Sequence, residues 1–123
     1  TCYWRKRNEQ GECGMKFKNC FEAVSEVMAV HYPEQLKNCV SEITHFCSFV
    51  DKLSEDSWAD ELAVVVDNDG HMSVSVGCVS VATSDEKHPL FALMRLSGSV
   101  GFEPCDNGNV WVHLPLPQEW FEV

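Results

Sequence analysis

The sequence has no closely spaced cysteine pair, no long hydrophobic run and few basic residues. Its seven cysteines are at least six residues apart, so the Cys-x2-Cys spacing of structural zinc sites is absent. Apolar runs such as Leu62 to Val66 are far shorter than the ~20 residues that a membrane-spanning helix needs. We therefore expect no metal, no cofactor and no membrane span in this chain.

Basic residues are scarce and gathered at one end. The chain has 9 Lys and Arg against 19 Asp and Glu, for a net charge of -10. Five of those basic residues and only two acidic ones fall within residues 1–20, which gives this segment +3 and leaves -13 for the rest. This excess of negative charge repels the phosphates of nucleic acid and therefore disfavours nucleic acid as a partner. The basic segment is the exception, because it could contact nucleic acid, an acidic protein or an anionic membrane surface.

The sequence also lacks an Asn-x-Ser/Thr acceptor site and an even number of cysteines. Both absences favour an intracellular location, in the cytoplasm or nucleus, because a secreted disulfide framework normally pairs its cysteines. We expect a buried, unreactive place for Cys20, Cys39, Cys47 and Cys78. Cys2, Cys13 and Cys105 could form disulfides or be modified. The alternative is a secreted or luminal ligand-binding domain stapled by two or three disulfides.

No catalytic motif is recognisable. There is no phosphate-cradling glycine loop, nucleophile elbow or dinucleotide fingerprint. Cys47 lies late in a predicted helix, where the helix dipole disfavours a thiolate. The segment 67–70 resembles a calcium loop, but its glycine is fourth rather than sixth, and Cys78 occupies the twelfth position. We interpret it as a turn, and we expect a protein that is not an enzyme.

Hydrophobic periodicity divides the remaining chain into a helical and a β part. Apolar residues recur at helical spacing over 15–32 and 34–53, interrupted by Pro33. From residue 62 the period changes to two, which predicts strands at about 62–66, 71–82, 90–102 and 109–115, with a further short piece at 119–123. A shift of the alternation at Gly77–Cys78 predicts a β-bulge. The prolines at 115 and 117 favour an early end or an edge position for the last strand.

These elements predict an α+β fold, in which an N-terminal helical pair precedes a four-stranded antiparallel meander sheet. Residues 1–14 are expected to be a flexible basic arm, and residues 15–123 a single α+β domain. The function that fits best is a non-catalytic, intracellular protein–protein interaction domain, which could be a piece of a larger protein. The sequence leaves self-association open. The candidate partner-binding residues are Trp111, His113, Trp120, Phe121, Arg5, Lys6 and Arg7.

Overall fold

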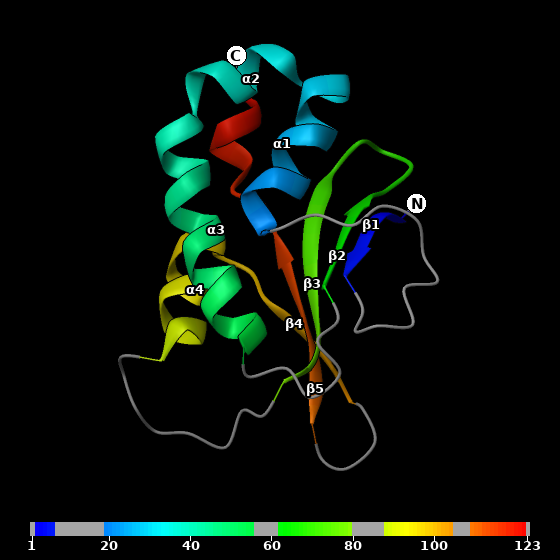
Figure 1. Cartoon of the computed structure of the whole chain (residues 1–123), viewed down its shortest axis with the longest axis vertical. Coiled ribbons are helices and arrows are strands. Elements are labelled where there is room, and N and C mark those ends of the chain that lie inside the picture. Colours follow the sequence, from blue (N-terminus) through cyan, green and yellow to red (C-terminus); the bar gives the residue numbers. More distant parts are fainter. Residues whose placement is uncertain (1, 7–18, 56–61, 80–87, 105–108, 123) are drawn as a thin grey trace.

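The computed structural model describes residues 2–6, 19–55, 62–79, 88–104 and 109–122 (Figure 1). Its elements, in chain order, are β1 (Cys2–Lys6), α1 (Cys20–His31), α2 (Pro33–Asn38), α3 (Val40–Glu55), β2 (Leu62–Val66), β3 (Met72–Val79), α4 (Pro89–Ser97), β4 (Gly101–Pro104), β5 (Val110–Pro115) and the 3-10 helix η2 (Gln118–Phe121). Helices lie against one face of an antiparallel sheet, which confirms the predicted α+β class. None of the helices within these ranges is long and apolar enough to cross a bilayer.

The helical half follows the predicted pattern, with one additional break. Asn19 caps α1, because its side-chain oxygen accepts a hydrogen bond from the backbone N–H of Glu22 at 2.8 Å. The predicted helix over 34–53 is divided at Cys39, whose backbone leaves helical geometry at φ -121° and ψ 21°. The break lets α2 cross between the ends of α1 and α3 (Figure 1). Residues 15–18 of the first predicted helix lie outside the described residues.

The sheet has five strands in the order β1-β2-β3-β5-β4, all antiparallel. The expected arm is wrong at residues 2–6, because these residues form the edge strand β1 on β2. Tyr3 and Trp4 are residue types that favour strands, and the neighbouring basic residues obscured that signal in the sequence. Residues 7–14 of the expected arm lie outside the described part of the chain.

The strand predicted over 90–102 is the main error, since most of it is helix α4. His88 caps this helix by accepting the backbone N–H of Leu90, and Pro89 occupies its first turn. Gly98 ends it in the left-handed conformation at φ 76°. The alternating residues Leu90, Ala92, Met94 and Leu96 fit a strand. The leucines at 90, 93 and 96 recur every third residue and fit a helix, so the capping residues decide for the helix. Only β4 remains as strand, and it forms the sheet edge beyond β5.

Other strand predictions are closer to the structure. The strand over 62–66 is confirmed, and β3 shows the expected irregularity as a register shift between Val76 and Val79. The edge position predicted for the last strand is wrong, because β5 lies between β3 and β4. The predicted strand piece at 119–123 is also wrong, since the described part of it belongs to η2 and the residue after it.

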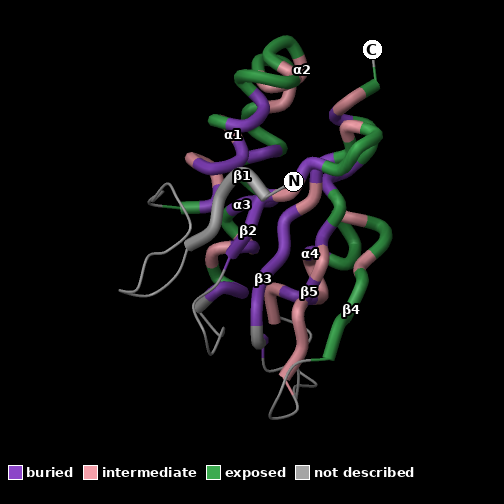
Figure 2. Tube along the Cα trace, turned by 90° about the vertical axis from the view of Figure 1, so that its right-hand side faces the viewer, coloured by how far each residue is buried: buried purple, intermediate pink, exposed green. Residues whose placement is uncertain are grey.

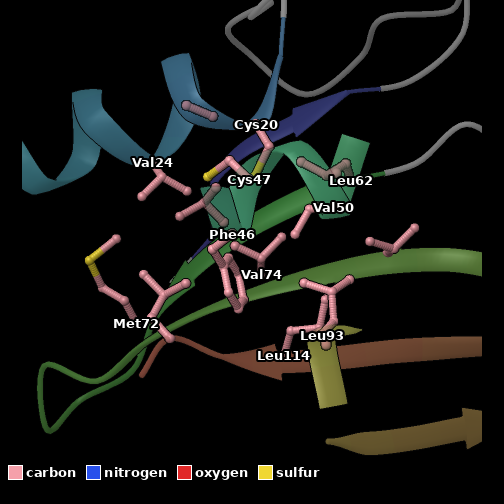
Figure 3. Close-up of a cluster of buried hydrophobic side chains, with 14 of the residues drawn as sticks. Cys20, Val24, Phe46, Cys47, Val50, Leu62, Met72, Val74, Leu93 and Leu114 are labelled. Atoms are coloured by element: carbon pink, nitrogen blue, oxygen red, sulfur yellow. The ribbon is translucent and has the colours of Figure 1, made fainter. Parts of the chain in front are cut away.

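The core lies between the helices and the sheet (Figure 3). The largest fully buried side chain is that of Phe46 on α3, and its ring meets the Trp120 ring edge-on with centroids 5.4 Å apart. Inward-facing residues of adjacent strands are aligned by register, as in the Val64–Val74 and Val74–Leu114 pairs. The helices therefore cover the face formed by these valines and leucines, and the alternate residues point to the opposite face.

Candidate functional site

The face of the sheet opposite the helices carries a group of polar and aromatic side chains. Alternation along β5 turns Val112 and Leu114 into the core and gives Trp111 and His113 to this opposite face. The antiparallel register places Ser75 of β3 and Glu103 of β4 beside them. We call Ser75, Glu103, Trp111 and His113 the sheet-face cluster.

His113 is the centre of the cluster. Its Nδ1 lies 2.7 Å from the hydroxyl oxygen of Ser75, within hydrogen-bonding distance. Its Nε2 lies 3.6 Å from a carboxylate oxygen of Glu103. The Trp111 ring lies almost parallel to the imidazole, at an interplanar angle of 7° and a centroid distance of 6.3 Å. The contact with Ser75 orients the imidazole, while Glu103 and Trp111 lie near its other sides.

Exposure rises across the cluster from the middle of the sheet to its edge. Ser75 is 5% exposed, whereas the side chains of His113 and Glu103 are 39% and 67% exposed. Each of the four residues of β4 is exposed (Figure 2). The cluster therefore offers an aromatic and charged surface at the β4 side of the sheet, with its serine underneath.

A serine, a histidine and a carboxylate in contact raise the question of nucleophilic catalysis. In a hydrolytic triad the serine oxygen must reach the substrate. Here Ser75 is only 5% exposed and its hydroxyl is engaged with Nδ1 of His113, and the Glu103 oxygen is too far from the imidazole for a strong hydrogen bond. This geometry suits binding through the ring surfaces better than attack by the hydroxyl.

The other predicted contact residues lie elsewhere. Trp120 is only 6% exposed and packs on Phe46, so its role in the described fold is in the core. Phe121 is half-buried and meets the Tyr32 ring edge-on at 4.8 Å between centroids. The structure thus brings Trp111 and His113 together and separates them from the two C-terminal aromatics.

The basic residues of the N-terminal segment are not part of the cluster either. Arg5 and Lys6 belong to β1, and Arg7 lies outside the described residues. Because β1 and β4 form opposite edges of the sheet, the basic segment and the sheet-face cluster would be separate contact regions.

A cavity of about 620 Å³ lies beside the turn between β2 and β3, and no sequence pattern indicated it. Tyr32, Ser73 and Phe121 contribute to its wall, together with residues of the Asp67–His71 turn. The Tyr32 hydroxyl donates to the carbonyl of Gly70 and joins the helical layer to this turn. The lining comes from distant parts of the chain, so no local motif could have identified it.

The turn between β2 and β3 holds the described residues that could offer ligands to a metal. Asp67, Asp69 and His71 have potential ligand atoms within 4.8 Å of one another, and all three are exposed. One carboxylate oxygen of Asp67 already accepts the backbone N–H groups of Asp69 and His71, and these bonds define the turn. The hydrogen bond from the backbone N–H of His71 is the main reason that the pKa of Asp67 lies below its ordinary value. A turn accounts for all these contacts.

Cys39, His45 and Cys47 lie within nine residues of one another in the sequence, and each has its own neighbours in the fold. Cys39 is half-buried, and its thiol approaches the carbonyl oxygen of Trp120 at 3.9 Å. The His45 ring packs edge-on against Phe49 at 5.0 Å. Cys47 lies in the core next to Cys20 (Figure 3). The side chain of Cys78 lies outside the described part of the molecule.

No family model, curated protein or solved structure matches the chain. Functional inference therefore depends on the geometry above. The sequence identified Trp111 and His113 from their alternation along a strand. It missed Glu103, because the strand predicted over 90–102 ends one residue before it, and it missed Ser75, whose outward position follows from the same alternation.

Proposed function

We propose that this chain is a non-catalytic protein-binding domain and that its contact surface is the sheet-face cluster. The observation that carries the proposal is the parallel packing of the Trp111 and His113 rings on the sheet face away from the helices. Ordered aromatic side chains bind with little further loss of rotamer freedom, which is why Trp and Tyr are enriched among interface residues that dominate affinity.

The face of the sheet is a better contact surface than its edge. Strand β4 has four residues and ends at Pro104, which has no backbone N–H to donate. Short, charged and proline-containing edges are the means by which proteins avoid pairing with foreign strands. A partner would therefore gain more from the side chains of Trp111, His113 and Glu103 than from backbone pairing with β4.

The charge of the chain indicates the character of the partner. The molecule has a net charge of -10, and Glu103 contributes an exposed carboxylate at the cluster itself. A protein surface with a basic residue near an apolar or aromatic patch would complement both the carboxylate and the indole ring. Like charge disfavours a strongly acidic partner at this surface.

The test compares Trp111→Ala with Val30→Ala. Val30 is an apolar residue on α1 that is 77% exposed, so its truncation removes apolar surface away from the sheet-face cluster. We expect Trp111→Ala to reduce the recovery of the native partner from the source extract at least tenfold, and Val30→Ala to leave it unchanged. The free energy of unfolding should change by less than about 1 kcal/mol in both.

Two results would contradict the proposal. Equal recovery with both variants would remove the cluster from the contact surface. A loss of several kcal/mol of stability in Trp111→Ala would show that the indole is a core residue. A fluorophosphonate probe tests the non-catalytic part directly, since labelling of Ser75 would reveal an activated serine.

The cavity near the β2–β3 turn favours ligand binding as a second candidate function. Its volume of about 620 Å³ is within the range of small-molecule pockets, and Tyr32 and Phe121 give it aromatic walls. Replacing Ser73 by Trp should fill part of the cavity. If native mass spectrometry shows a small molecule bound to the wild type and lost in Ser73→Trp, this second function gains support; a bare wild-type chain would count against it.

A further inference from the structure

Two cysteine side chains meet in the core between α1 and α3. Cys20 is the first residue of α1 and Cys47 lies in the middle of α3, with exposed fractions of 0% and 1%. Both are free thiols in this structure, and Cys47 is the cysteine that neighbours the Cys20 thiol. Figure 3 shows the two side chains next to one another beneath the start of α1.

A second contact holds the same two segments together. The carboxylate of Asp51, one turn beyond Cys47 on α3, accepts the backbone N–H of Cys20 at 2.9 Å. This N–H belongs to the first turn of α1, where backbone donors have no partner within the helix. The start of α1 is thus fixed to α3 by its backbone as well as by packing, so the two thiols have a defined relative position.

We propose that Cys20 and Cys47 form a disulfide that joins the first turn of α1 to the middle of α3 when the chain folds in an oxidising thiol–disulfide pool. The oxidant is a small-molecule disulfide such as oxidised glutathione. One cysteine sulfur attacks it and releases one small thiol; the second cysteine sulfur then attacks the mixed disulfide and releases the other. The two cysteines lose two protons and two electrons, and the reagent takes up both as two thiols.

The surroundings of the pair indicate when this reaction takes place. Burial raises the pKa of the Cys20 thiol, and the hydrogen bond and charge of Cys47 and the charge of Asp51 raise it further. Because the thiolate is the attacking species, the folded and reduced pair reacts slowly. Oxidation should therefore be fast during refolding and slow once the core is closed.

The peptide map of the chain makes the bond easy to detect. Trypsin cuts after Lys18, Lys37 and Lys52, so Cys20 falls in peptide 19–37, and Cys39 and Cys47 share peptide 38–52. After refolding with glutathione disulfide, blocking of free thiols and non-reducing digestion, we expect peptides 19–37 and 38–52 to appear as one linked species. Cleavage after Glu42 then separates Cys39 from Cys47.

Matched variants identify which cysteine is bonded to Cys20. The linked species should persist in Cys39→Ser and disappear in Cys47→Ser. Recovery of blocked, unlinked Cys20 and Cys47 from refolded wild type, or a link that disappears only in Cys39→Ser, overturns the proposal. Because Cys47→Ser could fail to fold, the wild type supplies an independent test: the oxidised form should unfold about 10 °C above the reduced form. Equal unfolding temperatures would also contradict it.

This inference is independent of the proposed binding surface, since it concerns the opposite layer of the molecule. It bears on location, however. The intracellular location expected from the sequence stays a prediction. If protein purified from its native source contained the Cys20–Cys47 disulfide, the secreted or luminal alternative would be favoured instead.

Discussion

At the scale of single residues, Cys20 shows how burial changes the chemistry of a thiol. The folded chain keeps this group as a neutral thiol at pH values where an unfolded chain would release its proton. Between these two pKa values the folded state binds more protons than the unfolded state, so stability falls as pH rises. The stabilisation is complete below the ordinary thiol pKa and is lost above it.

We therefore predict that reduced wild-type protein loses stability between about pH 8 and pH 10, with a slope of up to about 1.4 kcal/mol per pH unit from this thiol. Cys20→Ala should show a flatter profile over the same range. Urea unfolding at a series of pH values measures both curves. Parallel curves would show that Cys20 titrates alike in the folded and unfolded chains.

Phe46 has the largest fully buried side chain in the described part of the chain. It is 1% exposed, and its ring meets the Trp120 ring edge-on. We predict that Phe46→Ala lowers the free energy of unfolding by about 3–5 kcal/mol, because it leaves a cavity in the core. The half-buried Phe49, three residues further on α3, is the matched control, and its truncation should cost clearly less. Equal losses would mean that the core lies elsewhere.

At the scale of elements, alanine substitutions at three glycines distinguish the cost of backbone strain from the cost of steric contact. Gly98 ends α4 at φ 76° with no atom within 4 Å of an added Cβ, so alanine there adds strain alone. Gly70 has φ 85°, and its added Cβ would approach the Tyr32 hydroxyl at 2.8 Å. Gly101 has neither problem, because its Cβ would make an ordinary contact with His113 at 3.7 Å.

The predicted order of destabilisation is thus Gly70→Ala above Gly98→Ala above Gly101→Ala. Gly98→Ala should cost about 1–2 kcal/mol, the usual penalty of a left-handed backbone for a residue with a Cβ. Thermal unfolding of the three variants gives the order. If Gly101→Ala proved the most harmful, the backbone geometry at the end of α4 and in the β2–β3 turn would have to be revised.

The elements also show what sequence periodicity can predict. The long helical pattern over 34–53 predicted the helical segment but not its break at Cys39, and the β-rich run at 62–66 was located correctly. Over residues 90–97 the apolar residues fit two periods at once, since Leu90, Ala92, Met94 and Leu96 alternate while the leucines recur every third residue. The deciding signals were the cap at His88 and the stop at Gly98. Strand β1 is paired with β2, which is far away in the sequence, and the strand-favouring Tyr3 and Trp4 are too weak a local signal to predict that pairing.

At the scale of the whole molecule, the same limit applies to the candidate site. Alternation along one strand was enough to place Trp111 and His113 on one face. It could not show that β4 would bring Glu103 next to them, because that depends on the order of strands in the sheet. Nor could it show that η2 would fold back onto α3 and bury Trp120. The local residue pattern predicts on which face of a strand a side chain lies, whereas the order of strands decides which side chains lie next to it.

The central claim, that the chain binds another protein through the face of its sheet, is tested most directly by photo-crosslinking. Benzoylphenylalanine is introduced in place of Trp111 in one protein and of the exposed Val30 in another, and both are irradiated in the source extract. The account predicts one discrete crosslinked product from position 111, abolished by excess wild-type chain, and none from position 30. Crosslinking from position 30 with none from position 111 would contradict it.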